Sequence, residues 1–269
     1  MNRSVSATVV ELVAEGEGRR VSTANSAFVG HAINGPALRV AAQNNGIVRC
    51  VPVLSAAILH RDHRCVVVDK PAGIATHRGW DANDDALLQR VRDAVSTYVY
   101  PVHRLDRGAS GATLFALDRE AARAFCQSWA SAHTVKTYWA ITRGHPPEHL
   151  IIDHPIPSRP GGPRVAAVTE VWRRQVFGRY AVVEARPRTG RLHQIRRHLK
   201  HISCPLIGDV RYGKGEHNRL FRERFDLHRL ALHCVSLRIA HPEGGELSIE
   251  CPLATDLAAA IEAATRAFA

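Results

Sequence analysis

The pattern of apolar and polar residues is sharpest after residue 60, where it predicts a mixture of strands and helices. The apolar run at residues 65–69 (CVVVD) is typical of a buried strand, and the Pro and Gly that follow it end the element. A second strand, at 102–115, is interrupted by Gly108 and Gly111. Further strands are expected at 136–142, 168–173, 179–186, 231–239 and 247–251, with a Pro- and Gly-rich loop at 155–163.

Two segments have apolar residues at helical spacing, one following Asp84 and one following Asp118, each of which could cap its helix. Their apolar residues are Leu87, Leu88, Val91 and Val95 in the first, and Ala121, Ala122, Phe125 and Trp129 in the second. An alanine-rich helix ends the chain. Strands and helices mix without strict alternation and no internal repeat is visible, so we expect an α+β fold with a large mixed, mostly antiparallel sheet.

The first 57 residues carry only weak strand-like pieces, at 7–13 and 38–41, separated by Asn and Gly. They show no reliable periodicity and nothing typical of an S4-type RNA-binding module. We therefore expect an N-terminal extension of open role at residues 1–57 and one domain at 58–269.

The charge balance predicts a polyanionic partner. Lysine and arginine number 36 against 25 acids, a net charge of +11, and nearly all of these bases are arginine. Arginine forms bidentate contacts with phosphate and stacks on bases, which favours nucleic acid over a membrane surface. An arginine-rich codon bias is the alternative explanation.

The six cysteines include no close pair, which argues against a zinc ribbon and against a disulfide-stapled secreted fold. No stretch approaches 18 uninterrupted apolar residues, and acids interrupt the N-terminal apolar run too early for a signal peptide. We expect a cytoplasmic protein with reduced thiols and no membrane partner.

The strongest electropositive segment is residues 185–208, which contain no acid. On a helix at 192–201, the apolar residues share one face, Arg196 lies at its edge, and His193, Arg197 and Lys200 form an outer basic stripe. Arg197 and Lys200 would then be free to meet phosphates. Arg196 leans toward the core and needs a buried carboxylate, unless its side chain extends outward to solvent.

A candidate carboxylate lies in residues 103–107 (HRLDR), where Asp106 sits among bases at the start of a glycine-broken loop. This setting keeps the acid ionised and ready to act as a nucleophile or base. Taken alone, an ordinary surface ion pair is the better explanation, because such pairs are common.

Residues 103–111 (HRLDRGASG) resemble the signature of RluA-family pseudouridine synthases, in which Ala109 would be Thr. Four more segments match that family in order: 66–77 (VVVDKPAGIATH), 136–141 (KTYWAI), 189–213 (TGRLHQIRRHL followed by PLIGDVRYG) and 229–242 (RLALHCVSLRIAHP). Together they span about residues 58–252. The resemblance implies the pseudouridine synthase fold with a central basic cleft, and isomerisation of uridine in RNA without metal or other cofactor.

The resemblance also implies roles for individual residues. Asp106 would attack C1′ or assist a glycal route, Tyr138 would stack on the base and help proton transfer at C5, and Arg196 would pair with Asp106. Arg104 would fill the gap left by a flipped uridine, or only contact phosphate. The remaining expected RNA contacts are His103, Arg107, Arg188, Arg191, His193, Arg197 and Lys200.

The C-terminal half resembles the branch that modifies uridine 65 of tRNA more than the branches that modify ribosomal RNA, which remain the alternative. We expect RNA as the partner rather than DNA, and a monomer. A non-catalytic RNA-binding protein is a second alternative. A metal enzyme is a third alternative, suggested by His60 and His63 and by the histidines at 193, 198 and 201. Their spacing is poor for binding one ion, because His193 and His198 fall about 140° apart on a helix.

Overall fold

The computed structural model describes residues 38–40, 50–52, 56–77 and 86–269. The chain divides into two compact units, Met1–Ser55 and Ala56–Ala269. Within the described part of the first unit, β1 (Leu38–Val40) pairs antiparallel with β2 (Cys50–Pro52). This strand matches the one expected at 38–41, whereas the piece expected at 7–13 lies outside the described residues.

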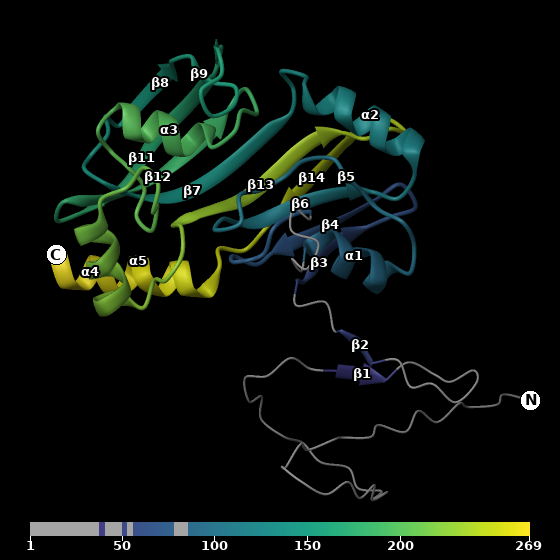
Figure 1. The fold of residues 1–269 in the computed structure, drawn as a ribbon, viewed down its shortest axis with the longest axis horizontal. Helices are drawn as coiled ribbons and strands as arrows, with labels where there is room; N and C mark the ends of the chain where they lie inside the picture. Colours follow the sequence, from purple (N-terminus) through teal and green to yellow (C-terminus); the bar gives the residue numbers. More distant parts are fainter. Residues whose placement is uncertain (1–37, 41–49, 53–55, 78–85) are drawn as a thin grey trace, which may run out of the picture. The chain divides into compact units, whose positions relative to one another are not determined.

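The second unit is built on a ten-stranded sheet (Figure 1). Its strands run in the order β3-β4-β6-β13-β7-β12-β11-β8, with β14 paired to β13 and β5 paired to β6. All these pairings are antiparallel except the one between β6 and β13. The expected mixed, mostly antiparallel sheet is confirmed.

The strands in chain order are β3 (Ile58–Arg61), β4 (Cys65–Lys70), β5 (Tyr100–Pro101), β6 (Ser110–Ala116), β7 (Val135–Arg143), β8 (His149–Asp153), β11 (Val168–Phe177), β12 (Tyr180–Pro187), β13 (Leu232–Ala240) and β14 (Glu246–Glu250). A separate small hairpin pairs β9 (Ile156–Pro157) with β10 (Arg164–Val165). The strands expected after residue 60 are therefore present, most of them with ends shifted by a few residues.

Five helices are described in this unit: α1 (Leu87–Val95), α2 (Arg119–Trp129), α3 (Gln194–His201), α4 (Gly215–Phe225) and α5 (Thr255–Phe268). The side chains of α2 and α3 pack in one hydrophobic core and those of α4 and α5 in another. On β12, Ala181 and Val183 join the first core while Tyr180 and Val182 join the second. Since neighbouring strand residues point to opposite faces, the two pairs of helices cover opposite faces of the sheet, as Figure 1 shows.

The helix ends follow the sequence in part. Asp118 is the N-cap residue of α2 and accepts a hydrogen bond from the Ala121 amide at 2.8 Å, as expected. Helix α1 has Ala86 as its N-cap residue and no side-chain cap, and Asp84 lies outside the described residues. Helix α4 was not predicted, because its segment (GEHNRLFRERF) is dominated by polar and charged residues.

The loop at 102–109, between β5 and β6, carries the HRLD segment, and the strand expected at 102–115 is thus a loop in its first half. Gly111 anchors the end of this loop where β6 meets β13 in parallel, opposite Cys234. Its φ is 111°, and a Cβ placed on it would overlap the backbone of Cys234. Only glycine allows this close approach, which fixes the loop against the sheet.

None of the helices that the structure describes combines the length and the apolar content of a membrane span.

Candidate active site

A cleft of about 570 Å³ opens beside the loop at 102–109. Most of its lining comes from four parts of the chain: that loop, the end of α2 at Trp129, the start of β7 at Lys136 and Tyr138, and the segment from Pro187 to Arg196. Ser158 and Leu232 complete it. Among the described residues that line the cleft, Asp106 is the single acid, and it is surrounded by arginine, lysine and histidine. The cleft is therefore basic, with one carboxylate at its centre.

Arg196 and Asp106 come from segments 90 residues apart and meet in this cleft. The Nη1 atom of Arg196 donates a hydrogen bond of 2.8 Å to Oδ2 of Asp106. The other carboxylate oxygen, Oδ1, lies 3.8 Å from Nε2 of His193 and accepts no hydrogen bond from the described residues. The pairing expected between Arg196 and Asp106 is present, and it leaves one oxygen of Asp106 facing the cleft.

Arg196 is held by a second carboxylate that the sequence analysis did not single out. Its Nε and Nη2 atoms donate hydrogen bonds of 2.7 and 2.9 Å to the two oxygens of Asp209, whose side chain is 0% exposed. The backbone amides of Arg211 and Tyr212 donate to the same carboxylate at 2.9 and 3.0 Å. The ring of Tyr212 also lies 5.1 Å from the Arg196 guanidinium. The orientation of Arg196 is therefore set from behind by Asp209.

The protonation states follow from burial and from these hydrogen bonds. Burial alone would raise the pKa of Asp209, but the hydrogen bonds from Arg196 and from the backbone lower it below its usual value. Burial works against the charge of Arg196, yet the hydrogen bonds to both carboxylates raise its pKa above the usual value. Burial lowers the pKa of His193, which keeps its imidazole neutral at pH 7.

Tyr138 lines the cleft from β7 and is 8% exposed. Burial, together with the nearby Cys234 and Asp106, raises the pKa of its phenol well above the usual value. The side chain is therefore a neutral phenol, placed as expected on the wall of the cleft that holds Asp106.

Lys136, two residues before Tyr138 on the same face of β7, is a cleft residue that the sequence analysis missed. It is only 4% exposed, and its amine lies 5.2 Å from the centre of the Trp129 ring. No described acceptor forms a hydrogen bond with this amine, and burial lowers its pKa. The sequence could have identified Lys136, because side chains alternate between the two faces of a strand and this places Lys136 and Tyr138 of β7 on one face.

His103 was expected to contact RNA, and the structure places it on the lining of the cleft with only 9% of the residue exposed. Its ring stacks on Trp129 at 4.1 Å, and its Nε2 accepts a hydrogen bond from the Leu114 amide at 3.1 Å. Burial, and then the charge of Lys136, lowers the pKa of His103 to about 3, so the ring is neutral. His103 therefore supports the wall of the cleft through Trp129.

The basic stripe expected on the helix at 192–201 needs a correction. Helix α3 begins at Gln194, with His193 as a left-handed N-cap residue (φ 54°), and so Leu192 and His193 lie outside it. Arg197 is half-buried: it donates hydrogen bonds of 3.0 Å to the Tyr212 hydroxyl and 2.6 Å to the Pro157 carbonyl. The side chain of Arg197 is thus bonded within the protein. The segment at 205–213, which carries Tyr212, covers the face of α3 that the helical pattern had predicted to be exposed.

The other basic residues expected to bind RNA are exposed. They are Arg104, Arg107, Arg188, Arg191 and Lys200. Of these, Arg188 also donates a hydrogen bond of 2.9 Å to Glu170. Arg104 and Arg191 lie on the lining of the cleft itself.

Gln194 shapes the segment before α3 and was also missed. Its Oε1 accepts hydrogen bonds from the Thr189 hydroxyl at 2.7 Å and the Arg191 amide at 3.0 Å. Its Nε2 donates to Thr169 and Val168 of β11, both at 2.9 Å. This amide therefore fixes the wall formed by residues 187–193 to the sheet.

The histidines weighed as metal ligands do not converge in the cleft. His198 is buried and bonds to Thr169 and to the His154 carbonyl, whereas His193 faces Asp106. Among the described residues, two groups bring three potential ligands together: His60, Asp62 and Cys65, and Asp69, His233 and Cys251. None of these six residues lines the cleft.

Comparisons with known proteins agree with this geometry. The family model described as RNA pseudouridylate synthase matches residues 64–201. The chain is 36% identical over 208 residues to the tRNA pseudouridine synthase C of Vibrio parahaemolyticus, which covers 69% of this chain and 85% of that protein. The enzyme of the same name from Salmonella typhimurium is 36% identical over 212 residues, covering 70% of this chain and 82% of that protein.

Solved structures show the same fold. Human RNA Pseudouridylate Synthase Domain Containing 4 is 27% identical with a TM-score of 0.63, and the match covers 78% of this chain and 92% of that one. Human RNA Pseudouridylate Synthase Domain Containing 1, at 23% identity, has a TM-score of 0.65 over 77% of this chain and 88% of that one. This chain belongs to the RluA family of RNA pseudouridine synthases. Enzymes of this class are intramolecular isomerases, and the curated relatives that match this chain at 36–37% identity include proteins named tRNA pseudouridine synthase C.

Proposed function

We propose that this enzyme converts a uridine of tRNA to pseudouridine, with Asp106 as the essential carboxylate. The observation that carries the proposal is the single acid of the basic cleft, held by Arg196 with one oxygen open to the cleft. The tRNA substrate is supported by the relatives named tRNA pseudouridine synthase C, which align over 85% of their length. The uridine at position 65 is the target that the resemblance implies.

The reaction breaks the bond between N1 of uracil and C1′ and forms a bond between C5 and C1′, with the proton of C5 moving to N1 overall. Loss of uracil leaves positive charge at C1′, which an adjacent carboxylate stabilises or captures as a covalent ester. Oδ1 of Asp106 is the oxygen available for this, since Oδ2 is bonded to Arg196. No atom has to be supplied by another reactant.

Tyr138 is proposed to hold the detached uracil. Its ring forms part of the cleft wall, and aromatic side chains stack on nucleobases that have left the helix. Because the pKa of its phenol is raised, Tyr138 remains protonated at neutral pH. Its proposed role is therefore packing and hydrogen bonding, rather than proton removal by a phenolate.

The exposed basic residues are proposed to hold the RNA. Arg104 lies on the cleft lining two residues before Asp106, where its planar guanidinium can fill the space left by the flipped uridine. Phosphates of the backbone are assigned to Arg107, Arg188, Arg191 and Lys200, with His193 at the cleft. Arg197 and His103 are left out of this set, because their side chains are engaged within the protein.

We further propose that residues 58–269 form the catalytic domain, that the enzyme acts as a monomer, and that it works in the cytoplasm. Every proposed site residue comes from the unit Ala56–Ala269 of one chain, which supports the first two points. The thiols of Cys65, Cys126, Cys204, Cys234 and Cys251 are free, which suits a reducing compartment.

The test is the variant Asp106→Asn with Asp226→Asn as its matched control, an exposed acid outside the cleft. We expect D106N to lower pseudouridine formation on unmodified tRNA by about a thousandfold or more, while D226N keeps the wild-type rate. The dissociation constant for tRNA should stay within about threefold in both variants, since the charge of Asp106 repels phosphate if anything.

Three other results would each correct part of the proposal. Substantial conversion by D106N would refute the role of Asp106. Conversion of ribosomal RNA but not tRNA by the wild type would refute the substrate. Binding of RNA without any conversion would favour the non-catalytic RNA-binding alternative.

A further inference from the structure

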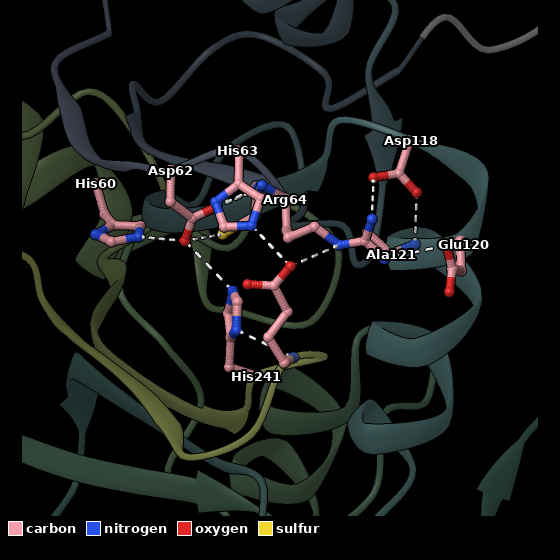
Figure 2. A network of polar contacts seen from close by, with 10 residues as sticks. His60, Asp62, His63, Arg64, Asp118, Glu120, Ala121 and His241 are labelled. Carbon is pink, nitrogen blue, oxygen red and sulfur yellow. Dashed lines mark hydrogen bonds and ion pairs between the residues drawn. The ribbon is translucent and has the colours of Figure 1, made fainter.

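Several potential metal ligands converge at the turn between β3 and β4, outside the catalytic cleft (Figure 2). The Asp62 carboxylate lies at the centre of this group. Its Oδ1 accepts hydrogen bonds of 2.7 Å from the backbone amides of Arg64 and Cys65, which fixes the carboxylate in the turn. Its Oδ2 faces Nε2 of His60 at 2.8 Å and Sγ of Cys65 at 3.5 Å.

His241, which follows β13, brings a second imidazole to the same oxygen. Its Nε2 lies 3.3 Å from Oδ2 of Asp62, and this nitrogen is buried without a hydrogen-bond partner. Its Nδ1 accepts a hydrogen bond of 3.3 Å from the Glu243 amide. His241 therefore lies against the carboxylate that holds the other two potential ligands.

Two of the three distances to Oδ2 are close to those of a tetrahedral metal site, and the third, from His60, is shorter. With bonds of about 2.0 Å to nitrogen and oxygen and about 2.3 Å to sulfur, tetrahedral ligands lie about 3.3 Å apart for nitrogen and oxygen, and about 3.5 Å apart for sulfur and oxygen. The contacts to Oδ2 are 3.3 Å from His241, 3.5 Å from Cys65 and 2.8 Å from His60. The ligand atoms of His60, Asp62 and Cys65 all lie within 4.8 Å of one another.

The neighbouring charged side chains point elsewhere. Nε2 of His63 bonds to Glu243 at 2.7 Å. Arg64 extends to Asp118, and the two side chains lie 3.1 Å apart (Figure 2). The turn-capping role of Asp62 accounts for its Oδ1 alone. It does not account for the thiol of Cys65 and the imidazole of His60 gathered at Oδ2, which are both potential metal ligands.

We propose that His60, Asp62 and Cys65 form a binding site for a divalent transition metal, with His241 held beside Asp62 and Zn²⁺ the ion that this donor set favours. Sulfur and imidazole ligands select zinc over magnesium or calcium, which prefer oxygen. Binding replaces the thiol proton of Cys65, which is released to solvent, so that the Asp62 carboxylate and the thiolate balance the charge of the ion. The site ties the turn between β3 and β4 to the end of β13.

The experiment uses the full chain, freed of metal by a chelator that is then removed, and titrated with Co²⁺ as a coloured substitute for Zn²⁺. We expect one equivalent of Co²⁺ to bind with absorption from a cobalt–thiolate bond, and Zn²⁺ to displace it. Zn²⁺ should also raise the thermal unfolding midpoint, because it binds the folded state.

Four variants make the assignment specific. Cys65→Ser and His60→Gln should each abolish the cobalt–thiolate absorption, and the second substitution is at a partly exposed side chain that the fold tolerates. His63→Gln, in the same turn, and Cys251→Ser, in the other group of potential ligands, should keep it. Absence of the absorption in the wild type, or its survival in C65S or H60Q, would overturn the proposal.

Discussion

The buried carboxylate of Asp209 offers the sharpest test of how the active site is built. In Asp209→Asn the side chain keeps its shape but loses its charge and one of its two acceptors. Arg196 then retains its hydrogen bond of 2.8 Å to Asp106, while one of its two bonds to position 209 faces an amide NH₂. The guanidinium is left partly uncompensated in a site where the Asp209 side chain is 0% exposed.

Breaking a buried ion pair by removing one partner costs about 3–5 kcal/mol. Because Asp106 still compensates part of the charge, we expect D209N to lower the free energy of unfolding by about 3 kcal/mol, at the low end of that range. For a domain of this size that corresponds to a fall of about 6–12 °C in the thermal midpoint. The same change at the exposed Asp226, paired only with His228, is the matched control and should have little effect.

Activity should fall together with stability in D209N. Arg196 loses the partner that orients it, so its hydrogen bond to Asp106 is no longer held in one geometry, and we expect kcat to drop about tenfold to a hundredfold. Chemical denaturation and single-turnover assays on tRNA at a temperature where the variant is folded measure the two effects separately. A decrease in unfolding free energy of less than about 1 kcal/mol, together with an unchanged kcat, would refute the reasoning that Asp209 positions Arg196.

Three further outcomes are expected. Lys136→Met should weaken RNA binding or kcat/KM by about tenfold, which equilibrium binding and kinetic assays measure. The variant should be at least as stable as the wild type in denaturation, because it loses a buried cation that has no acceptor among the described residues. The pKa of Asp209 is lowered in the folded protein, so its carboxylate stabilises the fold fully above the unfolded pKa of about 4 and loses this effect as the pH falls below that value. The difference in unfolding free energy between wild type and D209N, measured by urea denaturation, should therefore shrink in acid. Gly111→Ala should cost at least about 3 kcal/mol, because its Cβ overlaps Cys234, whereas Gly73→Ala, with a similar positive φ and open space, should cost about 1–2 kcal/mol.

The sequence predicted the fold well wherever local pattern and packing agree. The strand at 65–69 and the helix capped by Asp118 are present because an apolar run and an N-cap signal act within a few residues. Helix α4 was missed because its helical state depends on packing of Phe221 and Phe225 against strand β12 and helix α5 rather than on its own pattern. Tertiary contacts of that kind leave little trace in the local sequence.

The candidate site, like the fold, was predictable from the sequence only in part. Helical geometry indicated that Arg196 needs a carboxylate, and the resemblance pointed to Asp106 as that partner. The larger share of its hydrogen bonds goes instead to Asp209, the first acid after the acid-free stretch at 185–208. A turn after α3 brings Asp209 back to the helix, and no local periodicity describes such a turn. For the same reason Arg197 was expected at the surface, although that segment also supplies its partner Tyr212.

The position of Asp209 explains how one arginine can hold a reactive carboxylate without disabling it. An isolated arginine would form a bidentate pair with Asp106 and occupy both of its oxygens. Here the bidentate edge of Arg196, Nε and Nη2, is already taken by Asp209, and only Nη1 reaches Asp106. One charge of Arg196 is thus shared by two carboxylates, which leaves a net negative charge on the three groups and an oxygen of Asp106 free of hydrogen bonds from the described residues. That oxygen is the one that a positive centre at C1′ would meet.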